Sequence, residues 1–186
     1  NRNNGVSHFI EHMMFKGTKN RTARQIAEDM DKIGASSNAL TGKEATCYYI
    51  KTLTSNIYEG AEILIDMILN SKFLAKEMNK ERKVILEEIK MVKDSPDDDV
   101  YDTISELIHK GNPLGRSILG SPESLAGIDK SALTEYYKER YTAENIVVAV
   151  AGNFDEDRII GLFEERMSSL EPKSPKRKKI IKPYEQ

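Results

Sequence analysis

The mixture of many helical patterns with few strand patterns restricts the fold of this chain most. Apolar residues recur at helical spacing through most of the sequence, whereas strand composition is confined to two stretches. SSNALTGKEATCYYIKTL, residues 36–53, is typical of a hairpin around the turn TGKE, and NIVVAVAG, residues 145–152, is typical of a buried strand. Helices therefore outnumber strands, and we expect an α/β fold whose sheet includes strands outside this chain.

The helices are expected where apolar periodicity coincides with start and stop signals. Thr22 followed by Gln25 fits a capping box, and Gly34 can end the same helix in the left-handed conformation. Ser55 is expected to be an N-cap, and Pro96 with the acidic residues behind it suits a helix start. The expected helical ranges are 7–15, 22–34, 55–70, 74–94, 95–111, 131–140 and 155–168.

Composition narrows the function classes. With 186 residues, 39% of them apolar, and a net charge of -2, the chain can bury one good core. It contains no Walker loop, GxGxxG motif or aromatic-interleaved basic patch, and no apolar run long enough to cross a membrane. We therefore expect neither nucleic-acid binding nor a membrane span. The single cysteine, Cys47, excludes an internal disulfide and is expected to be a small buried side chain.

The segment SHFIEHMMFKGT places two of the three histidines four residues apart, with a glutamate before the second. On a helix, His8 and His12 project from nearly the same face, and Glu11 lies beside them. Zinc favours neutral imidazole nitrogens, and a nearby carboxylate that is not a ligand can accept a proton from a bound water. The pattern therefore predicts a zinc site, although short HxxEH matches also occur among ordinary helix histidines.

A catalytic zinc site needs a third protein ligand, which this motif lacks. His109 lies near the end of an acidic helix and is expected to be an ordinary solvated helix-end residue. The better candidates are the acidic residues of ERKVILEEIK, residues 81–90.

These residues together resemble a known family. SHFIEHMMFKGT is similar to the HxxEH signature of the inverzincins, the zinc metallopeptidases that include pitrilysin, insulin-degrading enzyme and mitochondrial processing peptidase. In that family a downstream glutamate is the third ligand and a glutamate seven residues before it supports the site; here Glu88 lies 76 positions after His12, and Glu81 lies seven before Glu88. Glu87 is the neighbouring alternative. The segments GASSNALTGKEATCYYIKTL, NPLGRSILGSPESL and YTAENIVVAVAGNFD also resemble the processing-peptidase branch.

The resemblance implies an α+β fold, in which a mixed, largely antiparallel sheet packs against helices in two layers, as one repeat of the processing-peptidase-like metallopeptidase fold. It implies a catalytic, zinc-binding domain over residues 1–170, without its first strand, and a basic, proline-containing linker over residues 171–186. That tail could instead contact nucleic acid or anionic membrane. The family's second, homologous half would follow the linker or be supplied by another subunit, as a homodimer or heterodimer.

The resemblance also assigns roles. His8, His12 and Glu88 would hold Zn2+, with Glu11 as general base and Glu81 orienting a histidine. Asn38 and Ala39 would lie on an edge strand that receives an extended or unfolded peptide substrate. The expected protein is a zinc-dependent endopeptidase of the bacterial cytoplasm, or alternatively of the mitochondrial matrix. A non-catalytic assembly subunit and a metal-retaining peptide-binding module of the same fold remain open alternatives.

Overall fold

The computed structural model describes residues 3–175, and the statements below concern these residues. Helices form most of the fold, and two strands form one antiparallel pair. The α-helices are α1 (Val6–Met14), α2 (Ala23–Lys32), α3 (Ile57–Asn70), α4 (Ala75–Asp94), α5 (Pro96–Ile108), α6 (Pro122–Gly127), α7 (Lys130–Arg140) and α8 (Glu156–Met167). The strands are β1 (Ser36–Thr41) and β2 (Thr46–Lys51), and the short 3-10 turns are η1 (Thr54–Asn56), η2 (Pro113–Gly115) and η3 (Ala143–Asn145).

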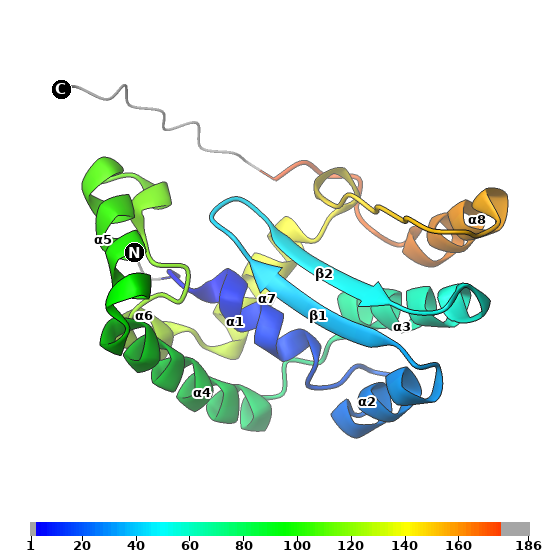
Figure 1. Ribbon diagram of the computed structural model, residues 1–186, viewed down its shortest axis with the longest axis horizontal. Helices are drawn as coiled ribbons and strands as arrows, with labels where there is room; N and C mark the ends of the chain where they lie inside the picture. The colour runs from blue at the N-terminus through cyan, green and yellow to red at the C-terminus, as the bar shows by residue number, and fades with distance from the viewer. Residues whose placement is uncertain (1–2, 176–186) are drawn as a thin grey trace.

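The hairpin of β1 and β2 lies over α1 and α3, and α4, α5 and α6 gather at one end of the molecule (Figure 1). Its register runs from Ser36 opposite Lys51 to Thr41 opposite Thr46, with the turn where the sequence predicts it. One face of the hairpin is covered by helices, and the other is open. Cys47 lies on the open face and is exposed, so the expectation that it is buried is wrong. Strand alternation turns it away from the helices.

Helix α1 is placed by packing on one side only. Its buried residues form one stripe against the core: Val6, Phe9, Ile10, Met13 and Met14. This stripe shares a core with residues of α4, α6 and α7, including Ile85, Leu125 and Leu133. The chain enters α1 through Gly5, whose φ of 87° is left-handed, and a Cβ there would lie 2.6 Å from the carbonyl oxygen of Leu119. Glycine is therefore required twice over, for its conformation and for the close approach of another backbone segment.

The predicted helix ends are partly confirmed. Thr22 and Gln25 form the capping box at the start of α2, and Gly34 adopts a left-handed φ of 60° after that helix. The expected cap at Ser55 is wrong, because Ser55 lies inside η1 and no side chain caps α3. Helix α6 was not expected; Ser121 caps it within the loop that follows α5.

The predicted buried strand at residues 145–152 is wrong for the described chain. Residues 146–151 form no strand and have no ladder partner within residues 3–175, and Val147 is 92% exposed. A strand is buried by its neighbours, so a strand-like run without a paired neighbour stays open on its surface. The α+β fold class itself is confirmed, as a helix-rich chain with a small antiparallel sheet.

The start of the expected linker lies against the domain. The carbonyl oxygens of Glu171 and Lys173 accept hydrogen bonds from the backbone of Ala143 and the hydroxyl of Thr142. Residues 176–186, most of the expected linker, lie outside the described residues. None of the described helices is both long and apolar enough to cross a membrane.

Candidate metal centre

His8, Glu11 and His12 lie on the face of α1 that is not packed into the core. All three side chains are partly buried, because α4 and the hairpin cover this face from two sides. The two imidazole rings meet edge to face, with centroids 4.6 Å apart. The apolar stripe fixes the rotation of α1, so core packing directs these polar side chains toward α4 and β1.

Helix α4 brings the acidic partners. Glu81 and Glu88 are seven residues apart, about two helical turns, so they share the face that packs on α1. The carboxylate oxygen Oε2 of Glu88 lies 3.7 Å from Nε2 of His8 and 3.5 Å from Nε2 of His12. We call His8, His12 and Glu88 the metal cluster; within residues 3–175 it is the group of histidine, cysteine or acidic residues whose donor atoms all lie within 4.8 Å of one another.

The donor set and spacing fit a tetrahedral zinc ion. Zinc bonds of about 2.0–2.1 Å to imidazole nitrogen and carboxylate oxygen, at tetrahedral angles, place neighbouring donors roughly 3.3–3.5 Å apart. The two distances at Glu88 are close to this value and exceed those of a strong charge-assisted hydrogen bond. The three side chains could therefore hold a metal ion while leaving a fourth position for water or substrate.

Glu81 and Lys16 orient the second histidine. Glu81 is buried, and its Oε2 lies 3.1 Å from Nδ1 of His12, while its Oε1 lies 2.8 Å from Nζ of Lys16. In the tautomer of His12 that carries its hydrogen on Nδ1, this nitrogen donates to Glu81 and the lone pair of Nε2 faces the metal cluster. Lys16 compensates the buried carboxylate. Sequence reasoning missed Lys16, which lies four residues after His12 and just beyond the end of α1.

His8 is held neutral by its surroundings. Burial, and then the proximity of His12, lower the pKa of His8 to about 4. Its Nδ1 atom is buried and has no hydrogen-bond partner among the described residues, in contrast to Nδ1 of His12. A neutral imidazole is the form that binds metal, so at neutral pH His8 needs to lose no proton to act as a ligand.

Glu11 approaches the hairpin instead of α4. Its Oε2 accepts a hydrogen bond from the hydroxyl of Thr41, the last residue of β1. Thr41 is a second residue that sequence reasoning missed, since it lies 30 positions from Glu11 and carries no local signal. Asn38 and Ala39, the predicted substrate residues, lie on the same strand, and the edge of β1 away from β2 is unpaired among the described residues.

The alternatives for the third ligand are separated by their positions. Glu87 is an exposed side chain paired with Lys90 at 2.7 Å, so it points away from the histidines that Glu88 approaches. His109 is exposed at the C-terminal end of α5, as expected for a helix-end residue.

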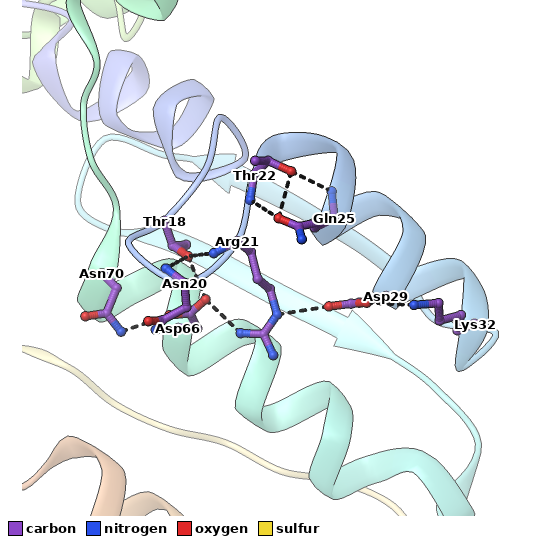
Figure 2. Close-up of polar contacts among 9 residues, drawn as sticks. All are labelled: Thr18, Asn20, Arg21, Thr22, Gln25, Asp29, Lys32, Asp66 and Asn70. Carbon is purple, nitrogen blue, oxygen red and sulfur yellow. Dashed lines mark hydrogen bonds and ion pairs between the residues drawn. The ribbon is translucent and has the colours of Figure 1, made fainter.

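A second acidic cluster fixes the loop that follows α1 (Figure 2). Buried Asp66 accepts hydrogen bonds from the hydroxyl of Thr18 at 2.7 Å, Nδ2 of Asn20 at 2.6 Å, Nη1 of Arg21 at 2.8 Å and Nδ2 of Asn70 at 2.9 Å. We call these five residues the Asp66 network. Burial alone would raise the pKa of Asp66, but the hydrogen bonds outweigh it and lower that pKa. The network joins the loop to α3.

Comparison with known proteins agrees with this architecture. The family model described as Insulinase (Peptidase family M16) matches residues 1–122, and the model described as Peptidase M16 inactive domain matches residues 127–186. The "Uncharacterized zinc protease YmxG" of Bacillus subtilis (strain 168) is 44% identical over 170 residues, which cover 91% of this chain and 41% of that protein. The "Probable mitochondrial-processing peptidase subunit beta, mitochondrial" of Arabidopsis thaliana is 39% identical over 167 residues, 90% of this chain and 32% of that protein.

A crystal structure of a protease from Helicobacter pylori has the same fold, with a TM-score of 0.87 at 24% identity over 98% of this chain and 44% of that one. These matches define a metallopeptidase fold in which the HxxEH motif, His8 to His12 here, lies on α1. The chain belongs to peptidase family M16, the insulinase family. The resemblance seen in the sequence is confirmed. The chain spans about 41% of the length of its Bacillus relative.

Proposed function

We propose that this chain is the zinc-binding, catalytic domain of an endopeptidase, with His8, His12 and Glu88 as ligands. The observation that carries the proposal is that one donor atom from each of His8, His12 and Glu88 lies within 4.8 Å of the others, with Glu11 next to His12 on the same helix. Relatives named as zinc proteases support the choice of metal. When bound, zinc would supply a water of lowered pKa and polarise the scissile carbonyl.

The protein side chains divide the remaining work. Glu11 accepts the proton of the attacking water and returns it to the nitrogen of the leaving amine, so no covalent enzyme intermediate forms. Glu81 fixes the tautomer and direction of His12, and Lys16 keeps Glu81 in place. The buried stripe of α1 keeps these groups from shifting when substrate binds.

The free edge of β1 supports the choice of an extended peptide as substrate. A peptide added to this edge would gain main-chain hydrogen bonds whatever its side chains are, so we propose unfolded or extended segments cleaved internally. Asn38 and Ala39 would contact it. A second homologous domain or subunit, in a homodimer or heterodimer, would supply the opposite wall of the cleft. The low coverage of the relatives supports this partner.

A non-catalytic peptide-binding or assembly subunit of the same fold is the second candidate, because residues 127–186 match the model described as Peptidase M16 inactive domain. The complete set of converging side chains favours the enzyme. For location we propose the bacterial cytoplasm, with the mitochondrial matrix as the alternative. The bacterial relatives support the first and the plant relative supports the second.

The test uses the full-length protein that contains this chain. Hydrolysis of an unstructured peptide should be abolished by a chelator and restored by zinc. The Glu11→Gln variant should retain zinc while kcat falls by roughly 10²- to 10⁴-fold, because the base is lost and the ligands are kept. The matched control Glu87→Gln, one residue from a proposed ligand, should keep both. A wild-type protein that binds zinc and the peptide without hydrolysis would support the binding-module candidate instead.

A further inference from the structure

Thr41 stands at the junction between the hairpin and α1. In β1 the half-buried positions alternate with exposed ones, and Thr41 shares the half-buried side with Ser37 and Ala39. Its hydroxyl donates to Oε2 of Glu11. A single hydroxyl hydrogen can make one such bond, so the oxygen of Thr41 remains an acceptor.

Thr46 completes a short chain of hydrogen bonds. It lies directly across the hairpin from Thr41, and the two hydroxyl oxygens are 3.3 Å apart. Because the hydrogen of Thr41 goes to Glu11, the hydroxyl of Thr46 is the donor between the two threonines. The hydroxyl of Thr46 therefore donates to the oxygen of Thr41, and the hydroxyl of Thr41 donates to Oε2 of Glu11.

From this geometry we propose that Thr41 is a positioning residue, which holds the carboxylate of Glu11 in orientation for proton transfer and joins that orientation to the strand that receives the peptide. The inference rests on the proposed function and deepens it. The terminal torsion of a glutamate is broad, so an unrestrained carboxylate samples many orientations. A bond to Oε2 fixes this torsion and leaves Oε1 for the water.

The hairpin does not depend on this hydroxyl for its own fold. Its turn is closed by a backbone hydrogen bond of 2.8 Å from Gly42 to Ala45. Nζ of Lys43 also donates to the carbonyl oxygen of Arg116 at 2.6 Å and lies 3.6 Å from Asp102 of α5. The loss of one hydroxyl should therefore leave the hairpin in place and act on Glu11.

The placement of Thr41 also links binding with chemistry. Asn38 and Ala39 lie three and two residues before Thr41 on the same strand. A peptide paired along the open edge of β1 would restrict the backbone of that strand, and with it the direction of the Thr41 side chain. A peptide too short to reach this part of the strand should gain less from the hydroxyl.

The main experiment compares Thr41→Val, Thr41→Ser and the control Thr52→Val in the full-length protein. Thr52 follows the same hairpin, and its hydroxyl donates to the carbonyl oxygen of Ile33, away from the metal cluster. For Thr41→Val we expect kcat to fall roughly 10- to 100-fold, as for a small misplacement of a catalytic group, with KM within about twofold and bound zinc unchanged. Thr41→Ser should recover kcat to within about threefold, and Thr52→Val should match wild type.

Three outcomes would overturn the inference. Unchanged kcat in Thr41→Val would show that the hydroxyl does not position Glu11. A rise in KM with constant kcat would assign the residue to peptide binding alone, and loss of zinc would assign it to the structure of the site. A wild-type protein that binds zinc but hydrolyses nothing would instead remove the proposed function.

A double-mutant cycle in thermal stability tests the contact between Thr41 and Glu11 without an activity assay. The shifts in Tm of the metal-free Thr41→Val and Glu11→Ala variants should sum to more than the shift of the double variant, because each single change already removes the same hydrogen bond. Additive shifts would mean that the two side chains are not coupled, and would overturn the inference even in an active enzyme.

Discussion

The metal cluster and the Asp66 network are both built around carboxylates on helices, Glu88 on α4 and Asp66 on α3, yet they differ in how their acceptors are used. Asp66 accepts four hydrogen bonds of 2.6–2.9 Å, and its oxygens face donors of matching geometry. Glu88 lies 3.5 and 3.7 Å from its two histidine nitrogens. The Asp66 network is closed, whereas the metal cluster has donor atoms spaced for an ion between them.

This difference separates a structural acidic cluster from a functional one. In the Asp66 network the charge of one arginine and three neutral donors satisfy the carboxylate, so nothing further is needed (Figure 2). In the metal cluster, His8 faces the acid without supplying a positive charge, because burial and the proximity of His12 lower the pKa of His8 to about 4. The missing charge is what a divalent cation brings.

The largest effect should come from Glu88. Replacing it with Gln removes the charged ligand, and loss of one of three ligands should weaken zinc binding by roughly 10²- to 10⁴-fold, because each ligand carries a share of the binding free energy. Competition with a chelating dye would measure the affinity. Glu87→Gln is the matched control, and a comparable loss there would reverse the assignment of the two acids.

A substitution in the Asp66 network should lower the stability of the fold and leave zinc affinity unchanged. In Asp66→Asn, one acceptor oxygen becomes an NH2 group that faces other donors, and the charge that pairs with Arg21 is lost. The free energy of unfolding should therefore fall by about 2–4 kcal/mol, as for a broken buried pair. Denaturant titration would measure it. The control Glu62→Gln removes one partner of an exposed ion pair with Arg166 and should cost less than about 1 kcal/mol. Zinc loss in Asp66→Asn beyond that explained by unfolding would contradict the separation.

Glu81 lies between the two classes, since it is buried and paired like Asp66 but touches a ligand. Glu81→Gln should lower zinc affinity by roughly 10- to 100-fold, because His12 loses the acceptor that orients it. The same chelator competition would detect this. An unchanged affinity, with only a lower Tm, would place Glu81 among the structural residues.

The smallest expected effect is the response of the Asp66 network to acid. The pKa of Asp66 in the folded protein lies below its ordinary value of 3.8, so its charge stabilises the fold fully above that value. As pH falls through the lower, folded pKa, this stabilisation is lost. The difference in Tm between wild type and Asp66→Asn should therefore be constant from neutral pH to about 4 and shrink below it. A difference that shrinks already between pH 7 and 5 would point to another group.

Local spacing accounts for what the sequence could reveal of the site. The four-residue interval between His8 and His12, and the seven-residue interval between Glu81 and Glu88, each place side chains on one helix face. Both intervals follow from the helical repeat, so they can be recognised in the sequence before the fold is known. The pairing of the two helices came from the resemblance to a known family and not from periodicity.

Contacts between distant segments left no such trace. Thr18 and Asp66 are 48 positions apart, and Thr41 and Glu11 are 30 apart. A threonine in a strand and an aspartate in a helix are common and need no special partner, so only the folded structure shows which residues they contact. The prediction of a buried strand at residues 145–152 was wrong for a related reason. Its composition favours a strand, but a strand is buried only by neighbouring segments, and composition does not show whether these are present.

The helix that carries the two histidines is anchored in the core partly by methionine side chains. Met13 and Met14 lie beneath the site at 1% and 0% exposure, and the hydroxyl of Ser71 contacts the sulfur of Met14 at 3.3 Å. Oxidants convert exposed thioethers to sulfoxides, whereas these two are shielded while the helix stays docked. The rate of sulfoxide formation at these two methionines therefore reports how often α1 separates from the core. Mass spectrometry could measure this rate for each methionine.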